Sequence, residues 1–209
     1  MTRILVADDH AILRRGLKEI LERELQDVGI GEAGTAEQVL SQLESHDWDL
    51  VILDITMPGR TGLDVLKSLK GLHPRLPVLV LSMHPEDQYG KRVLRAGASG
   101  YMNKESAPEE LIKAVRKVLT GGRYVGPALA EKLATDLSPA HDKSPHELLS
   151  DREFEVLRRI GGGQSIGQIA EEMNLGVTTV STYRTRLLTK LDLKTTAELV
   201  RYVIENQIL

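Results

Sequence analysis

The chain has 209 residues, no cysteine and a formal net charge of −3 at pH 7. Its length suits one large domain or two small ones, and the lack of cysteine excludes a disulfide framework, a thiol nucleophile and a cysteine-ligated zinc site. No stretch approaches the roughly 20 apolar residues that span a bilayer, and the first apolar run is too short for a signal-peptide core, so we expect a cytoplasmic protein without membrane contact. The net charge argues against a surface that is basic throughout and binds nucleic acid everywhere.

Strands and helices alternate up to about residue 120, which predicts a doubly wound α/β domain on a five-stranded parallel sheet. Apolar residues recur three or four apart in five segments, which are therefore predicted helices, at about 11–26, 35–45, 61–70, 86–96 and 107–120. Gly121 and Gly122 end the last of them. A short helix is expected at 127–135, and residues 136–148, with two prolines and little apolar content, are typical of a linker.

Acidic side chains and a lysine stand at the ends of these short apolar runs. Asp8 and Asp9 close the first run, Asp54 closes a second, and Lys104 follows a third. Ligands gather beyond the carboxyl ends of parallel strands, and like charges this close need a cation and a lysine. Hard oxygen ligands favour Mg²⁺ over zinc. The alternative is three unrelated acids at strand ends.

From Leu149 onward the alternation gives way to helices alone, which predicts a small all-α domain. Ser150 and Glu153 form a capping box at the start of the first helix, and Gly161 to Gly163 end it. Three more helices are predicted at about 165–173, 177–191 and 196–206. The second and third are joined by a tight turn that contains Gly176, which is the pattern of a helix-turn-helix.

The third helix of this segment has an apolar stripe and a polar face. The stripe, expected to pack inward, consists of Val177, Val180, Leu187 and Leu191. The polar face presents Thr178, Ser181, Thr182, Thr185 and Thr189, with Arg184 and Arg186 at its borders. Between residues 177 and 194, four basic residues including Lys190 and one acid leave a net charge of +3, which favours contact with DNA. The alternative is a solvated polar face.

The N-terminal pattern resembles a bacterial response-regulator receiver domain. The shared residues are Asp8-Asp9, Asp54-Ile55-Thr56-Met57-Pro58-Gly59 with Gly62, then Ser82, and Tyr101 three residues before Lys104. The resemblance runs from residue 3 to about 120 and implies a flavodoxin-like fold.

The resemblance also implies a role for each residue. Asp54 would be the phosphoacceptor, forming a 4-aspartylphosphate. Asp9, with Asp8 alongside, and the backbone carbonyl of Thr56 would bind Mg²⁺ together with Asp54. The remaining implied roles are a phosphoryl contact by Lys104, a switch formed by Ser82 and Tyr101, and a position of Thr56 and His84 beside the attacking water. Tyr101 could otherwise be a half-buried strand aromatic, and His84 an exposed loop residue.

The C-terminal pattern resembles a LuxR-type helix-turn-helix, through Leu149 to Glu153, Ile169-Ala170, Thr179 to Arg184 and Lys190-Leu191. Joined to a receiver, it resembles the NarL/FixJ type of response regulator. The implied division is a receiver at 1–122, a linker with a short helix at 123–148 and a DNA-binding domain at 149–209. The implied DNA-binding residues are Thr178, Ser181, Thr182, Arg184, Thr185, Arg186 and Lys190. Many members have lysine where Ser181 stands and histidine where Tyr183 stands, so the preferred base sequence does not follow.

The resemblance implies a transcription regulator that is controlled by a sensor histidine kinase. It would not be an enzyme, because it would catalyse only its own phosphorylation and dephosphorylation. Double-stranded DNA with inverted half-sites, RNA polymerase and a second copy are its implied partners. The apolar residues of the last helix exceed what a small core can cover and would form the dimer interface: Leu199, Val200, Val203 and Ile204.

Two functions from other classes fit part of the pattern. A phosphatase of the haloacid-dehalogenase type also uses a strand-end aspartate with Mg²⁺. That family has a second aspartate two residues further on, where this chain has Thr56. Alternatively, the C-terminal helices could form a module that binds protein or RNA, which the salt dependence of duplex DNA binding would distinguish.

Overall fold

The computed structural model describes residues 1–57, 62–84, 86–106, 108–136 and 144–208. The chain forms two compact units that divide between Leu137 and Ser138. Pro58 and Gly59 of the receiver-like motif, and residues 137–143 of the predicted linker, lie outside the described residues.

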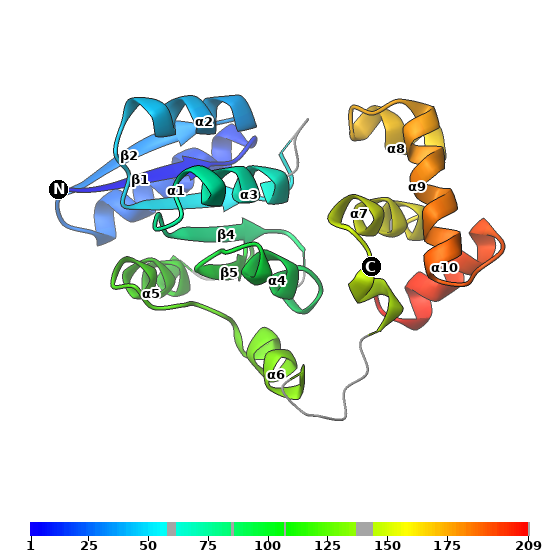
Figure 1. Ribbon diagram of the computed structural model, residues 1–209. Helices are drawn as coiled ribbons and strands as arrows, with labels where there is room; N and C mark the ends of the chain where they lie inside the picture. The colour runs from blue at the N-terminus through cyan, green and yellow to red at the C-terminus, as the bar shows by residue number, and fades with distance from the viewer. Residues whose placement is uncertain (58–61, 85, 107, 137–143, 209) are drawn as a thin grey trace. The chain divides into compact units, whose positions relative to one another are not determined.

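The N-terminal unit is built on a parallel sheet of five strands in the order β2-β1-β3-β4-β5 (Figure 1). The strands are β1 (Thr2–Ala7), β2 (Val28–Ala33), β3 (Leu50–Asp54), β4 (Val78–Ser82) and β5 (Gly100–Asn103). Every residue of β3 and β4 is buried. Strands covered on both faces need continuous apolar runs, which is why these segments do not alternate. The predicted doubly wound α/β fold is confirmed.

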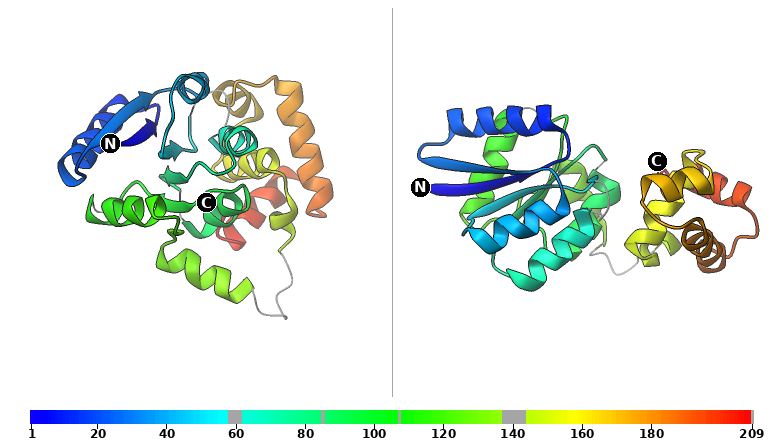
Figure 2. Two further views of the ribbon diagram at one scale, coloured as in Figure 1. Left: turned by 60° about the vertical axis from the view of Figure 1, so that its left-hand side comes forward. Right: turned by 90° about the horizontal axis from the view of Figure 1, so that it is seen from above.

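Five helices cover the two faces of this sheet (Figure 2). They are α1 (Ala11–Glu24), α2 (Ala36–Ser45), α3 (Gly62–Leu72), α4 (Glu86–Arg95) and α5 (Pro108–Leu119). One core joins β1, β3 and β4 to α1 and α5, while α2 packs beside α3. The helix predicted at 11–26 ends at Glu24, because Leu25 is extended, with φ −114° and ψ 131°.

A sixth helix, α6 (Pro127–Asp136), belongs to the N-terminal unit and not to a linker. It packs on α4, where Leu129 is fully buried. A Cβ added to Gly90 would lie 2.4 Å from Leu129 Cδ2, so the glycine makes room for this contact. Glu86 Oε1 accepts hydrogen bonds from the backbone N–H groups of Ala128 (3.0 Å) and Leu129 (3.3 Å). The helix α6 therefore packs with the N-terminal unit, beyond the boundary predicted at residue 122.

The C-terminal unit is helical, as predicted. It contains the short 3₁₀ helix η1 (Pro145–Leu148) and the helices α7 (Asp151–Gly161), α8 (Ile166–Glu172), α9 (Val177–Lys190) and α10 (Thr196–Glu205). Capping boxes begin three of them: Ser150 with Glu153, Ser165 with Gln168, and Thr195 with Glu198. Asn174, with φ 51°, makes the turn from α8 to α9 and so completes a helix-turn-helix.

One residue of the predicted inward stripe on α9 is placed differently. Val180, Leu187 and Leu191 are buried, but Val177 is exposed. Val177 is the first residue of the helix, directly after the N-cap Gly176. At 56% exposed, its side chain lies largely in solvent, so the prediction that Val177 packs inward was wrong.

The predicted dimer residues on α10 also divide into two sets. Leu199 and Val203 are 0% exposed, whereas Ile204 is 60% exposed, and Val200 is half-buried. A Cβ added to Gly161 would lie 2.3 Å from Val203 Cγ1, so α7 and α10 approach closely at this point. Leu199 and Val203 therefore belong to the core of the unit and are unavailable to a second copy.

In the part of the chain that the structure describes, no helix combines the length and apolar character required to cross a membrane.

Candidate functional site

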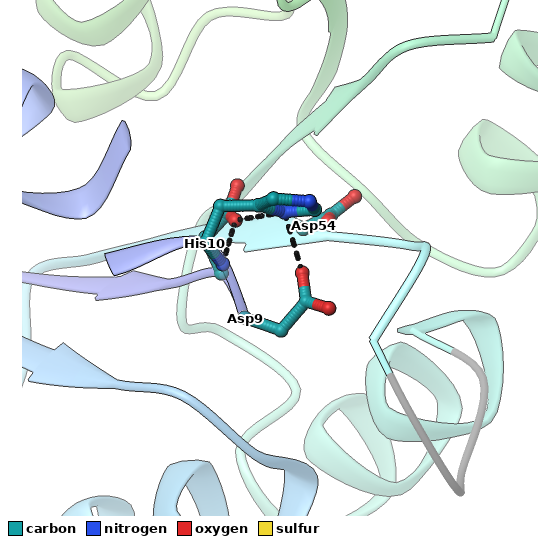
Figure 3. A group of neighbouring side chains, drawn as sticks. Asp9, His10 and Asp54 are labelled. Carbon is teal, nitrogen blue, oxygen red and sulfur yellow. Dashed lines mark hydrogen bonds and ion pairs between the residues drawn. The ribbon is translucent and has the colours of Figure 1, made fainter. Parts of the chain in front are cut away.

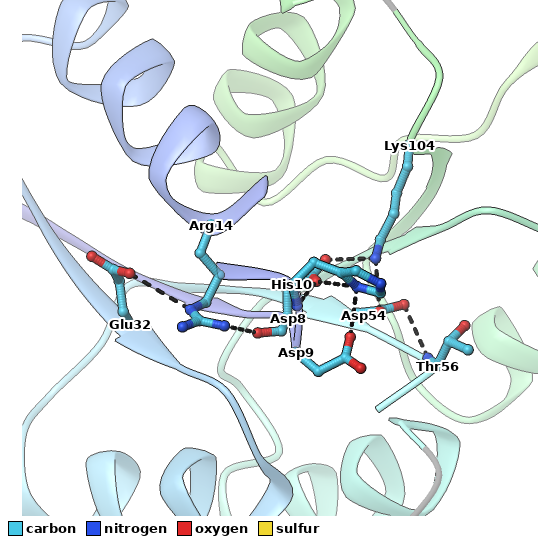
Figure 4. Close-up of polar contacts among 8 residues, drawn as sticks. All are labelled: Asp8, Asp9, His10, Arg14, Glu32, Asp54, Thr56 and Lys104. Carbon is cyan, nitrogen blue, oxygen red and sulfur yellow. Dashed lines mark hydrogen bonds and ion pairs between the residues drawn. The ribbon is translucent and has the colours of Figure 1, made fainter. Parts of the chain in front are cut away.

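Strand ends bring two carboxylates and a lysine together at one edge of the sheet. β1 and β3 pair with Ala7 opposite Leu53, so Asp8 and Asp54 stand side by side. Lys104 follows β5 and places its Nζ 2.7 Å from Asp54 Oδ2 and 2.5 Å from Asp8 Oδ2 (Figure 4). The strand-end acids are therefore not unrelated, and the expected convergence is present.

Burial and ion pairing act in opposite directions on this group. Asp54, Asp8 and the Lys104 side chain are all nearly inaccessible to solvent. Burial raises the pKa of Asp54, and the hydrogen bond from Lys104 offsets part of this rise. Burial acts to lower the pKa of Lys104, but its bonds to Asp54 and Asp8 outweigh burial, so the pKa is raised overall. The ammonium of Lys104 is therefore charged and pairs with both carboxylates.

The chain next to Asp54 holds the carboxylate in place. The backbone N–H of Thr56 donates a hydrogen bond of 2.9 Å to Asp54 Oδ1. Gly62, at the start of α3, donates from its own N–H to the carbonyl oxygen of Ile55 at 3.1 Å. A Cβ on Gly62 would lie only 2.3 Å from the carbonyl oxygen of Asp54. Glycine is thus required here so that the helix can approach the strand that ends in Asp54.

Ser82, His84 and Tyr101 form a connected group beside the acids. Ser82 ends β4 in a fully buried position, and its Oγ accepts a hydrogen bond of 3.1 Å from the N–H of His84. Tyr101 is also fully buried and donates from its hydroxyl to the carbonyl oxygen of His84 at 2.8 Å. The ring of His84 stacks on Tyr89 with centroids 4.7 Å apart. Tyr101 is therefore not a half-buried aromatic, and His84 is not a plain exposed loop residue.

Four potential metal ligands lie together at this edge. One ligand atom each from Asp8, Asp9, His10 and Asp54 falls within 4.8 Å of all the others. Figure 3 labels Asp9, His10 and Asp54, and Figure 4 also labels Asp8. Carboxylate oxygens with one imidazole and no sulfur suit a hard or borderline divalent cation. The acids were predicted, but His10 was not. Its position directly after the acid pair was the only signal in the sequence.

The polar face of α9 is open to solvent, as a DNA-reading surface requires. Its exposed residues include Thr178, Ser181, Thr182, Thr185 and Arg186. The hydroxyl of Thr182 donates to the carbonyl oxygen of Thr178 at 2.9 Å, and that of Thr185 to Ser181 at 3.1 Å. The hydroxyl protons are thus engaged within the helix, which leaves oxygen lone pairs and methyl groups to face a partner.

Two further residues predicted to bind DNA have partners within the unit. Arg184 is half-buried and donates from Nε to Thr196 Oγ1 of α10 at 2.7 Å. Lys190 Nζ lies 2.6 Å from Glu153 Oε2 at the start of α7. Burial acts to raise the pKa of Glu153, but bonds from Lys190 and Ser150 outweigh it and lower the pKa overall. Arg184 and Lys190 thereby brace α9 against α10 and α7.

A parallel sheet of this order with acids and a lysine at its carboxyl edge, joined to a helix-turn-helix unit, defines a two-component response regulator. The family model of the response regulator receiver domain matches residues 4–116, and that of the luxR family of bacterial regulatory proteins matches residues 147–203. The chain belongs to the response regulators that join these two domains, the NarL/FixJ type, and is a phosphorylation-controlled, DNA-binding transcription regulator. This family membership excludes both alternative functions, the haloacid-dehalogenase-type phosphatase and the C-terminal module that binds protein or RNA.

Relatives match along almost the whole chain. The response regulator UvrY of Escherichia coli K12 is 32% identical over 207 residues, which is 99% of this chain and 95% of UvrY. The response regulator GacA of Pseudomonas viridiflava is 35% identical over 211 residues, 99% of this chain and 97% of GacA. RcsB of Salmonella enterica serovar Typhimurium, solved on the promoter rprA with a phosphomimetic, has 28% identity and a TM-score of 0.68, covering 97% of this chain and 98% of RcsB.

Proposed function

We propose that Asp54 accepts a phosphoryl group from the phosphohistidine of a cognate sensor histidine kinase. The observation that carries this proposal is the contact of Lys104 Nζ with both Asp54 and Asp8. Mg²⁺ would be held by Asp8, Asp9, Asp54 and the backbone carbonyl of Thr56. Bound there, it would neutralise charge on the oxygens of the group in transfer.

In the proposed reaction a carboxylate oxygen of Asp54 attacks phosphorus, the bond from phosphorus to the histidine nitrogen breaks, and the imidazole leaves. The ammonium of Lys104 then stabilises the negative charge of the acyl phosphate. Water later hydrolyses the acyl phosphate and resets the carboxylate, with Thr56 and His84 beside its path. The chain thus catalyses only its own phosphorylation and dephosphorylation.

Exposed apolar side chains beside the acids support access by a partner protein. Ile12, two residues after His10 and at the start of α1, is 91% exposed. Met83, directly after Ser82, is exposed too. Both line one cavity together with His10 and Lys104. Exposed apolar groups around a polar centre are typical of a surface that a partner covers.

Phosphorylation is proposed to act through Ser82 and Tyr101. Moving a two-state population from 1:99 to 99:1 takes about 5.5 kcal/mol of differential stabilisation. New bonds from Ser82 and Lys104 to the phosphoryl group would supply part of this. Ser82 and Tyr101 both contact His84, in the loop before α4, so movement at Ser82 would be passed to the surface formed by α4, β5 and α5.

For DNA, we propose that α9 lies in the major groove with its exposed hydroxyl face toward the bases and Arg186 toward phosphate or guanine. Arg184 and Lys190 would hold the helix at the correct angle. The related RcsB, solved bound to promoter DNA, supports contact of this chain with DNA. We further propose that phosphorylation makes two copies dimerise through Val200 and Ile204, and that the dimer binds inverted half-sites about one helical turn apart. The protein would act in the cytoplasm, with RNA polymerase as a further partner.

Selection of bound sites from a random pool of duplex DNA, with and without an acyl-phosphate donor, tests this function as a whole. Enrichment of inverted repeats that depends on the donor is the expected result. Binding without sequence preference, or without any response to the donor, would contradict it.

Arg186→Ala is expected to weaken DNA binding and to reduce the slope of log affinity against log salt by about one, because a phosphate contact releases a counterion. If Arg186 reads guanine instead, preference at one position of the site relaxes by about 1–3 kcal/mol. Gel shifts at several salt concentrations measure both. Arg201→Ala, on the exposed surface of α10, is the matched control and is expected to leave the slope unchanged. Equal behaviour of the two variants would exclude Arg186 from the interface.

Lys104→Ala is expected to leave metal binding largely intact and to uncouple phosphorylation from DNA affinity. The substitution removes the ammonium that contacts Asp54 and Asp8 but no oxygen ligand. Asp9→Ala, in contrast, removes a ligand and should weaken Mg²⁺ binding and phosphorylation together. Calorimetric titration with Mg²⁺, followed by gel shifts of the phosphorylated proteins, separates the two variants. A full gain in DNA affinity for phosphorylated Lys104→Ala would contradict the assigned role.

A further inference from the structure

The N-terminal half of α9 presents a face without charge. Residues four and eight apart lie on the same side of a helix, so Val177, Ser181 and Thr185 form one row, with Thr178 and Thr182 beside it. All five are exposed. The N-terminal residues of a recognition helix are those that contact base edges in the major groove. Any base that α9 contacts in this way therefore meets a neutral surface.

The basic residues of α9 lie outside this face or have partners within the unit. Arg184 is half-buried and donates from Nε to Thr196 Oγ1 at 2.7 Å. Lys190 Nζ lies 2.6 Å from Glu153 Oε2, and Arg186 is exposed at the border of the face. Guanine is recognised chiefly by two parallel hydrogen bonds from arginine or lysine. Because Arg184 and Lys190 are engaged elsewhere, guanine is not the main base that the face selects.

Hydrogen bonds within the helix fix what its threonines present. The hydroxyl of Thr182 lies 2.9 Å from the carbonyl oxygen of Thr178. Those of Thr185 and Thr189 lie 3.1 Å from the carbonyl oxygens of Ser181 and Thr185. A carbonyl oxygen carries no proton, so each hydroxyl donates its own. A hydroxyl held against the preceding turn also selects one χ1 rotamer, which fixes the methyl group. Each threonine therefore offers a partner an oxygen lone pair and a methyl group in a set position.

An A·T base pair complements both of these groups. In the major groove thymine carries its C5 methyl group and adenine an N6 donor. Guanine shows two acceptors, to which a hydroxyl that already donates its proton cannot bond, and a G·C pair has a donor on cytosine but no methyl group. Val177, at 56% exposed, adds further methyl groups at the N-terminal end of the same row. The face thus matches thymine methyl groups over its first turns.

We propose that α9 recognises A·T pairs through their thymine methyl groups, and that Val177, Thr182 and Thr185 are the residues that select them. The inference rests on the proposed contact of α9 with DNA and adds the class of base that this contact prefers. Each half-site then has a core of A·T pairs, with guanine confined to the position that Arg186 reaches.

Replacing thymine by uracil in the DNA tests the proposal, because uracil keeps the base pair and lacks only the C5 methyl group. The phosphorylated full chain is titrated with the duplex that the site selection yields, and the thymines are replaced one at a time. Affinity should fall about fourfold at each contacted thymine of the half-site core, as expected for the loss of one buried apolar group of this size. Thymines outside the half-sites should show no change.

Thr182→Ser gives the second readout, because it removes the methyl group and keeps the hydroxyl. It should bind thymine DNA about fourfold more weakly, with no further loss when the thymine that it contacts is replaced by uracil, since the two changes remove the same contact. Thr189→Ser is the matched control and should bind with unchanged affinity. Thr189 makes the same kind of hydroxyl bond on the same side of α9, but about two turns nearer the C-terminal end.

A selected half-site without a core of A·T pairs, or equal affinity for thymine and uracil duplexes, would overturn the inference and leave DNA binding by α9 intact. Losses for Thr182→Ser and uracil that add at every position would remove Thr182 from the contact. Binding without any sequence preference would overturn the proposed function as well. The uracil measurement uses the native chain, so its result does not depend on the folding of a variant.

Discussion

Asp54→Asn is expected to abolish stable phosphorylation and to leave the fold intact. The amide keeps the shape of the carboxylate and can still lie beside Lys104, but it is no nucleophile. It also removes one negative charge from the cation site. Incubation with labelled acetyl phosphate and Mg²⁺ measures the effect. Asp49→Asn, an exposed residue just before the opposite end of the same strand, is the control and should be labelled like the native chain.

The stability of this variant follows from the pKa of Asp54. Burial raises that pKa above the ordinary value of 3.8. A carboxyl with a raised pKa contributes stability at low pH, and this contribution is lost as the pH rises through the native-state pKa. At a pH above that native-state pKa, ionisation of Asp54 costs stability, and Asn removes that cost. The melting temperature should be equal to or above that of the native chain. Undiminished label on Asp54→Asn would show that the acceptor is elsewhere.

The strand-end acids and the lysine were predictable because their signal is local. A short β-branched run is a buried strand almost wherever it occurs, and in a parallel sheet all the carboxyl ends meet at one edge. The pairing of Ala7 with Leu53 then places Asp8 beside Asp54 without further information. His10 lacks such a signal, because the direction of its ring depends on the first turn of α1 and on Asp8, and spacing along the chain does not encode it.

The position of α6 depends on contacts between distant residues. Its packing requires the missing side chain of Gly90 and the carboxylate of Glu86, some 40 residues earlier in the chain. A proline-containing segment of modest apolar content has the composition of a linker in either case. The sequence therefore predicts a helix at 127–135 but not the surface that it covers.

The apolar residues of α10 could not be divided from the sequence either. Helical periodicity shows which side of the helix is apolar, but not how many of those residues the core buries. Leu199, Val200, Val203 and Ile204 were all candidates for a dimer interface. Leu199 and Val203 instead fill the core of the unit. The close approach of α7 at Gly161 decides this, and only the packed structure contains that information. Ile204, one residue after Val203, points away from the core and remains available for a partner.

Val203→Glu is therefore expected to unfold the C-terminal unit and not merely to prevent dimerisation. Val203 is fully buried against Gly161. A buried glutamate has a pKa raised by up to 3–5 units, which corresponds to about 4–7 kcal/mol. Domains of this size have a free energy of unfolding of only about 4–10 kcal/mol. The variant should lose the melting transition of this unit and bind neither a full inverted repeat nor an isolated half-site.

Ile204→Glu is the matched variant, because it places the same charge on the neighbouring residue of the same helix, where the side chain is 60% exposed. It should melt like the native chain and bind an isolated half-site with unchanged affinity. Its cooperative binding to the full inverted repeat should fall, because two like charges would face each other across a two-fold interface. Circular dichroism melts recorded beside the binding curves separate the outcomes. A normal melt for Val203→Glu would contradict its place in the core, and unchanged cooperativity for Ile204→Glu would exclude this face of α10 as the dimer surface.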